Sequence, residues 1–306
     1  MNTPNTPAPH PRAAGGRSLV LGGGGLVGIA WLVGVVSGLA DEGLDLVDAA
    51  APDATIGTSA GSIVGAFLAR KEPLSELRER SISDETSSLA LEAAAHVDFT
   101  MMLQVFDTWS RLTDNSPASL AQVGMFACKA PTLPEADYVR SFNDLVGPAW
   151  TGDGFRCAAV DTSTGELRLF GPDHGVAMDL AVASSCSVPG LFPPVTIGPS
   201  RYTDGGVRSG TNADLVAGST HVLVLSPMGS FAADPLDVAA KLILDNEVAD
   251  LRSAGSVVTT LLPDDETNAA TMGSPFGRMD PGSRGPALEH GIRQGRSLAS
   301  VLATAW

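Results

Sequence analysis

The sequence predicts an α/β fold in which a mostly parallel central sheet is flanked by helices. Two strand–turn–helix units within the first 70 residues, followed by several apolar strands, are the basis of this prediction. A strand that leads directly into a helix pairs with the next strand in parallel, because the helix carries the chain back across the sheet. The chain has 306 residues, 44% of them hydrophobic and 17% charged, so it can bury a sizeable core.

The first unit begins with an apolar strand at residues 18–21. The glycine run 22–25 follows at once, and residues 29–42 carry apolar side chains at helical spacing. Before this unit, residues 1–17 are rich in Pro, Asn, Thr and Ala and are expected to form a disordered tail. They lack the basic start and apolar stretch of a signal peptide, and no apolar run is long enough to cross a membrane. We therefore expect a cytoplasmic protein, with peripheral membrane contact left open.

The second unit has a short strand at residues 54–57, a sharp turn, and a helix at 62–70. After this unit we expect a helix-like segment at 74–109, a less regular stretch at 113–134 and a helix at 138–146. A hairpin of 155–161 and 166–170 and a short helix at 178–185 are expected next. Strands at 201–204 and 221–225 and helical structure from about 235 onward complete the prediction. Residues 18–306 are predicted to form one domain. A helical cap is expected at about 75–150, and an exposed or mobile loop rich in Gly, Pro and Asp at about 264–286.

The turn of the second unit reads Gly57-Thr58-Ser59-Ala60-Gly61 and matches the Gly-x-Ser-x-Gly pattern of a nucleophile elbow. In such an elbow, glycines allow a tight strand-to-helix turn where a Cβ would clash. The serine hydroxyl projects into a cleft, and the following helix points its N-terminal N–H groups toward developing negative charge. Ser59 is therefore the candidate nucleophile of an acyl hydrolase.

A serine hydroxyl needs a base, and two candidates follow from the sequence. His290 has the chain order of an α/β-hydrolase triad, but its neighbours carry no loop signature, and a partly exposed helix histidine is the better explanation. Asp204 ends a predicted strand and precedes Gly205 and Gly206. It can lie at a cleft formed by strand ends, or it can simply cap its own turn.

The glycine run offers backbone N–H groups without side chains in the way. Gly23-x-Gly25-x-x-Gly28 also matches a dinucleotide-binding pattern, but the second strand does not end in the acidic residue which that pattern needs. An oxyanion hole is the alternative, in which the N–H groups of Gly23, Gly24 and Gly25 stabilise a tetrahedral intermediate.

Taken together and in this order, the segments Gly22–Gly28, Gly57–Gly61 and Asp204–Gly206 resemble the patatin-like phospholipase family. Residues 183–195 also resemble the segment that precedes the aspartate in bacterial members. The resemblance implies a three-layer fold with a helical cap. It implies a Ser–Asp dyad without histidine, with Ser59 as nucleophile and Asp204 as general base.

The same resemblance adds the N–H of Ala60 to the oxyanion hole and makes Gly28, Gly57, Gly61, Gly205 and Gly206 motif glycines. It implies hydrolysis of a lipid acyl ester, of the phospholipase A or esterase type, with neither a cofactor nor a metal. Family members usually carry Arg or Lys where this chain has Val27. The alternative is a catalytically weak relative that binds a lipid or a protein partner.

The composition limits the partners. A net charge of −15 argues against nucleic acid and against electrostatic attraction to anionic membranes. The three cysteines are widely spaced and predict neither a disulfide framework nor a zinc site. An apolar cluster at 99–109 serves either as core packing or as a surface for an acyl chain. The sequence does not determine the oligomeric state.

Overall fold

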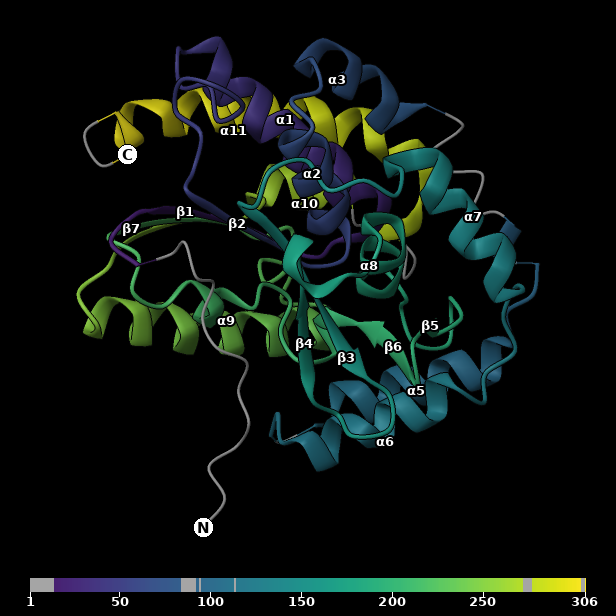
Figure 1. Ribbon diagram of the computed structural model, residues 1–306. Coiled ribbons are helices and arrows are strands. Elements are labelled where there is room, and N and C mark those ends of the chain that lie inside the picture. Colours follow the sequence, from purple (N-terminus) through teal and green to yellow (C-terminus); the bar gives the residue numbers. More distant parts are fainter. Residues whose placement is uncertain (1–13, 84–91, 94, 113, 272–276, 304–305) are drawn as a thin grey trace.

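The computed structural model describes residues 14–83, 92–93, 95–112, 114–271, 277–303 and 306, and it has three layers (Figure 1). An eight-stranded sheet with the order β5-β6-β3-β2-β1-β7-β8, in which β4 also pairs with β3, lies between two layers of helices. This arrangement confirms the predicted α/β class and the helices on both faces.

The strands are β1 (Arg17–Leu21), β2 (Ala54–Gly57), β3 (Phe155–Asp161), β4 (Leu167–Phe170), β5 (Val195–Ile197), β6 (Ser200–Asp204), β7 (His221–Leu225) and β8 (Val257–Leu261). The five strands from β3 to β8 in the sheet order are parallel to one another. The remaining strands β4, β6 and β5 are added by antiparallel pairing, and β3 with β4 forms the predicted hairpin. The sheet is therefore mostly parallel, as expected.

The helices are α1 (Gly25–Asp41), α2 (Ala60–Ala69), α3 (Leu74–Ile82), α5 (Phe99–Ser110), α6 (Pro117–Ala127), α7 (Glu135–Val146), α8 (Met178–Ser185), α9 (Pro235–Ser253), α10 (Asp265–Thr271) and α11 (Arg284–Leu302). In Figure 1, α1, α2, α3 and α11 cover one face of the sheet, α9 lies across the other, and α5 and α6 lie together near β3. Within the described part of the chain, none of these helices has the length and apolarity that crossing a membrane requires.

Alternation along the central strands separates two apolar cores. In β1, Leu19 and Leu21 belong to the core beneath α1, α2 and α11, whereas Val20 belongs to the core beneath α9. In β7, Leu223 alternates with Val222 in the same way. Successive side chains of a strand point to opposite faces, so a continuous apolar run is what a strand covered on both faces requires.

The strand register brings distant segments to one edge of the sheet. Leu21 pairs with Gly57 on one side and with Leu225 on the other, so the glycine run and the Ser59 turn leave the sheet at the same level. The antiparallel strand β6 returns along β3 and ends with Asp204 opposite Ala159. Ala159 is close to Cys157, the β3 residue that is level with Gly57. Asp204 consequently arrives beside the Ser59 turn from the opposite direction.

Three expectations about segment boundaries need correction. The predicted tail extends too far, because the N–H of Gly15 donates to the carbonyl of Gly218 at 2.9 Å and Arg17 already belongs to β1. Residues 1–13 of that tail lie outside the described residues. The loop expected at 264–286 contains α10, the 3-10 turns Gly277–Met279 and Pro281–Ser283, and the start of α11, while 272–276 lie outside the described residues. Asp264 accounts for α10, because its side chain accepts hydrogen bonds from the N–H and hydroxyl of Thr267.

The helices of the segment expected as a cap, at about 75–150, lie in two different places. α3 packs against α1 and α11, and α7 packs against α8, so both belong to one outer layer. α5 and α6 pack on each other, and their buried residues Val105, Leu120 and Val123 share a core with Val160 of β3. Only this second pair of helices lies in a position to cover a site at the strand ends.

Candidate active site

Ser59 lies in a strained turn between β2 and α2. Its φ of 52° and ψ of −121° are rare for a residue with a Cβ, so the surrounding structure must stabilise them. The Ser59 carbonyl accepts hydrogen bonds from the N–H of Ser62 at 2.8 Å, the hydroxyl of Ser62 at 2.6 Å and the thiol of Cys186 at 3.2 Å. These bonds hold the turn and leave the Ser59 side chain at the surface of a pocket.

The motif glycine Gly61 is needed because α2 approaches the end of β1 closely. A Cβ at this position would lie 1.9 Å from the carbonyl oxygen of Leu21, which no side chain could accommodate. The close approach places the N-terminus of α2 next to the glycine run that follows β1. The glycine at position 61 of the motif is therefore required by the close packing of α2 on β1 as well as by the turn.

Asp204 lies at the end of β6 and is only 2% exposed. Its Oδ1 accepts a hydrogen bond from the N–H of Gly206 at 2.7 Å, while its Oδ2 has no hydrogen-bond partner among the described residues. Burial raises the pKa of Asp204 to about 7, although the nearby Ser59 hydroxyl and the Gly206 N–H both act to lower it. Asp204 therefore both caps its own turn and lies at the pocket, the two alternatives that the sequence left open. With this pKa, its carboxyl can exchange a proton near neutral pH.

The glycine run lies against the nucleophile. A Cβ on Gly23 would be 3.2 Å from the Cβ of Ser59. The prediction that Gly23 offers a free N–H is wrong, because this N–H donates to the carbonyl of Gly210 at 2.8 Å. That bond anchors the run to the segment following Asp204, and it removes Gly23 from the set of available donors.

Three other predicted donors remain available. Gly24 caps α1, Gly25 is its first residue, and Ala60 is the first residue of α2. The first N–H groups of a helix have no partner within the helix, and these three have no acceptor among the described residues. Two helix N-termini therefore meet near Ser59, where their partial positive charge favours an anion.

Asn212 connects the two halves of the site, and the sequence analysis did not single it out. It is fully buried with a φ of 52°, a left-handed conformation that Asn tolerates. Its Nδ2 donates to the hydroxyl of Thr58 at 3.1 Å and to the carbonyls of Gly205 at 3.3 Å and Ser209 at 2.8 Å. Its Oδ1 accepts from Arg208 at 2.8 Å. One side chain thus joins the Ser59 turn to the Asp204 turn.

A second buried acid supports this arrangement. Glu247 of α9 accepts hydrogen bonds from the hydroxyl of Thr211 at 2.7 Å and from the N–H of Ala213 at 3.0 Å. Burial raises the pKa of Glu247 to about 7. Because Thr211 and Ala213 flank Asn212, Glu247 ties the loop that carries Asn212 to α9.

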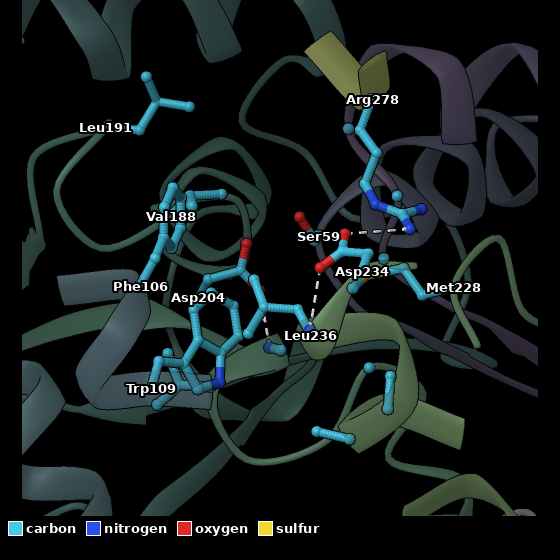
Figure 2. A pocket seen from close by; sticks show the side chains of 18 of the residues that line it. Ser59, Phe106, Trp109, Val188, Leu191, Asp204, Met228, Asp234, Leu236 and Arg278 are labelled. Carbon is cyan, nitrogen blue, oxygen red and sulfur yellow. Dashed lines mark hydrogen bonds and ion pairs between the residues drawn. The ribbon is translucent and has the colours of Figure 1, made fainter. Parts of the chain in front are cut away.

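Ser59 and Asp204 line a pocket with a volume of about 860 Å³ (Figure 2). In Figure 2, Phe106 and Trp109 of α5 lie on the Asp204 side, whereas Asp234 and Arg278 lie on the other side of Ser59. The apolar residues that line this pocket are Val97, Phe99, Met102, Phe106, Trp109, Leu112, Val188, Leu191, Val207, Met228, Phe231, Ala233, Pro235, Leu236, Ala239, Ala240, Ile243, Met279 and Pro281. Within the apolar cluster at 99–109, Val105 is part of the buried core and Trp109 faces the pocket.

Histidine does not take part in this arrangement. Within the described part of the chain, no histidine lines the pocket. The Nδ1 of His290 on α11 lies 3.3 Å from the hydroxyl oxygen of Thr267. The described residues also contain no group of three or more His, Cys, Asp or Glu side chains arranged to hold a metal ion. Of the two candidate bases, only Asp204 lies beside Ser59.

The sequence profile of the patatin-like phospholipase family matches residues 19–217. The chain belongs to this family. The match covers the glycine run, the Ser59 turn and the Asp204 turn, all of which border the pocket.

Among solved structures, the patatin-like chain is similar to VipD from Legionella pneumophila, at 15% sequence identity and a TM-score of 0.45. That similarity covers 95% of this chain and 67% of the other. No curated protein sequence matches the chain at a significant level.

Proposed function

We propose that this patatin-like protein hydrolyses lipid acyl esters with Ser59 as nucleophile and Asp204 as general base. Family membership supports lipid acyl hydrolysis in general. The observation on which the specific proposal rests is the Oδ2 of Asp204, which is buried without a hydrogen-bond partner among the described residues and lies beside the strained Ser59 turn. A carboxyl with a pKa of about 7 is a far better base than an ordinary aspartate.

In the acylation step, Asp204 takes the proton of the Ser59 hydroxyl while Oγ bonds to the ester carbonyl carbon. The carbonyl oxygen becomes an oxyanion, which the N–H groups of Gly24, Gly25 and Ala60 stabilise; one such donor is typically worth about 3 kcal/mol. When the tetrahedral intermediate collapses, the alcohol leaves with the proton from Asp204. An acyl group remains on Ser59.

In the deacylation step, Asp204 takes a proton from water as the water oxygen attacks the acyl carbonyl. The same N–H groups stabilise the second oxyanion, and its collapse returns the proton to Ser59 and releases a fatty acid. The apolar walls from α5 and α9 hold the acyl chain in both steps, because burying the chain there removes it from water.

Apolar side chains at the rim support access of a lipid to this pocket. Phe99 lines the pocket and is 51% exposed, Leu103 on the same helix is 58% exposed, and Leu242 of α9 is 65% exposed. Contact of this rim with the surface of a lipid aggregate would bring an ester to Ser59 without full transfer through water.

Labelling with a fluorophosphonate probe, followed by peptide mapping, tests the proposal. We expect the probe on Ser59, and we expect Ser59→Ala to remove labelling and to lower kcat for a p-nitrophenyl acyl ester by a factor on the order of 10⁴ or more. Ser253→Ala, which changes an exposed serine on α9, is the matched control and should retain both. A folded Ser59→Ala protein with full activity would refute the proposal. An unlabelled, inactive wild-type protein would favour the lipid-binding alternative.

A further inference from the structure

Arg278 is the one cation among the described residues that line the pocket, and its position makes it the natural candidate to bind an acidic head group. It belongs to the 3-10 turn Gly277–Met279, and its backbone packs on the glycine run: a Cβ on Gly25 would be 2.7 Å from the carbonyl oxygen of Arg278. The other charged residues that line the pocket are Asp204 and Asp234. The charge balance at this end of the pocket therefore depends on what Arg278 binds.

Arg278 is already engaged by two carboxylates. Its Nη2 donates to Asp237 of α9, a residue only 1% exposed, and lies 3.7 Å from the Oδ2 of Asp234. Its Nη1 donates to the carbonyl of Pro227 at 3.2 Å. A guanidinium between two carboxylates leaves this cluster with a net negative charge, so it does not offer a binding site for an anion.

Among the described residues, no other side chain that lines the pocket is a cation, since the remaining lining residues are uncharged or acidic. The internal segments that the structure does not describe, 84–91, 94, 113 and 272–276, contain no Lys, Arg or His, whereas residues 1–13 contain His10 and Arg12. A phosphate bound beside Arg278 would be placed close to two carboxyl groups, those of Asp234 and Asp237, with its one potential counter-ion among the described residues already paired.

We propose that the substrate is an acyl ester without a phosphate group, an uncharged lipid ester such as an acylglycerol. This inference rests on the proposed acyl hydrolase function and specifies its substrate class. The alcohol side of the substrate lies near Arg278 and Asp234, where hydroxyl groups can donate to a carboxylate and accept from a guanidinium. A phosphate there meets like charge instead, and placing like charges next to each other disfavours the complex.

The test compares three substrates with the same acyl chain in the same neutral detergent micelles: a monoacylglycerol, lysophosphatidylcholine and lysophosphatidylglycerol. We expect the highest kcat/KM for the monoacylglycerol and the lowest for lysophosphatidylglycerol, with a difference of at least about tenfold. The difference should persist in 1 M salt, because salt screens the field of the whole acidic protein over about 3 Å but acts weakly on a partly buried cluster.

Asp234→Asn changes the charge at the cluster and preserves the helix start. Asp234 caps α9 by accepting a hydrogen bond from the N–H of Leu236 at 2.9 Å, and Asn is an equally good N-cap. We expect the ratio of lysophosphatidylglycerol to monoacylglycerol kcat/KM to rise about fivefold. The matched control is Asp250→Asn on the exposed face of α9, which changes the net charge equally and should leave this ratio unchanged.

Wild-type protein that hydrolyses lysophosphatidylglycerol or lysophosphatidylcholine as fast as the monoacylglycerol overturns the inference. Loss of the preference in 1 M salt also overturns it, as does an equal shift of the ratio in both variants, because either result assigns the effect to the overall charge. These outcomes differ from failure of the proposed function. In that case Ser59 is not labelled by the fluorophosphonate, and the p-nitrophenyl ester and all three lipids remain intact.

Discussion

Two buried aspartates are associated with this pocket, and their surroundings differ: Asp204 lines the pocket, whereas Asp237 pairs with the lining residue Arg278. Asp237 on α9 has a partner for each oxygen, with Arg278 at Oδ1 and the N–H of Phe231 at Oδ2, 2.9 Å away. Asp204 at the end of β6 interacts with the N–H of Gly206 and the Ser59 hydroxyl, and it has no cationic partner among the described residues. Burial raises the pKa of both carboxyls, but at Asp237 the charge of Arg278 opposes the rise.

The comparison shows that burial alone does not make a carboxyl reactive. A paired carboxylate in a helix stabilises its surroundings, since removing one partner leaves a charge unpaired. A carboxyl with an open oxygen beside a hydroxyl can move a proton. The helical side of the pocket therefore maintains its shape, and in the proposed mechanism the strand-end side carries the chemistry.

Replacing each aspartate by asparagine separates these two roles and should give the largest effect. Asp204→Asn should lower kcat/KM for a p-nitrophenyl ester by about 10²- to 10⁴-fold, because the general base is lost. It should not lower the melting temperature, because the amide of Asn replaces a buried carboxyl that has no counter-ion among the described residues.

Asp237→Asn should do the reverse. It should cost about 2–3 kcal/mol of unfolding free energy, since the only carboxylate that then remains near Arg278 among the described residues is the more distant Asp234, and it should spare most of the activity measured below the melting transition. Equal losses of activity in both variants would contradict the assignment of separate roles.

Asn212→Ala should weaken the connection between the two turns at Ser59 and Asp204. We expect kcat to fall by about 10- to 100-fold with a small change in KM, because a small displacement of paired groups slows the chemical step more than binding. Asn212→Gly is the control, since glycine accepts the positive φ but also lacks the hydrogen bonds. If Asn212→Gly restores the wild-type kcat, the backbone conformation is responsible and the side-chain connection is not.

The pH dependence of activity should report Asp204. Its base form requires loss of a proton with a pKa of about 7, so kcat/KM should rise about tenfold between pH 6 and 8 and level off above. A flat profile from pH 5 to 8 would mean that Asp204 titrates at its ordinary value.

The same pKa has a defined effect on stability. The pKa of Asp204 has its ordinary value of 3.8 in the unfolded chain and is about 7 in the folded protein, so the folded state binds more protons between these two pH values. Its contribution should therefore weaken the fold as the pH rises from about 4 to about 7. Glu247 contributes in the same direction, so the measurement is the difference in unfolding free energy between wild type and Asp204→Asn.

Trp109→Ala should produce the smallest change, because it alters only the wall of the pocket. Shortening this side chain removes apolar surface from the acyl-binding side, so we expect kcat/KM to fall about fivefold for long-chain esters and to change little for short ones. A chain-length series of p-nitrophenyl esters measures this. A uniform loss at every chain length would indicate a disturbed site and not a shortened acyl contact.

Several parts of the fold could be read from local sequence, and others could not. The strands that contain Val20 and Val224 are recognisable in the sequence as continuous apolar runs, because both of their faces are covered. Strand β8 was missed within the stretch expected to be helical, since Thr259 and Thr260 give it a weak apolar pattern at the sheet edge. Helix α6 was also missed, although Ser116 at its N-cap and Pro117 after it are a recognisable start signal.

The Ser59 turn, the glycine run and the Asp204 turn follow from local sequence, because each depends on glycines at short spacing and on an adjacent strand. Three features emerge only when the chain is folded: the N–H of Gly23 is already bonded, Asn212 joins the two turns, and Arg278 lines the pocket as a paired cation. These contacts join segments that are far apart in the chain. Their partners are set by strand register and helix packing, which no local pattern encodes.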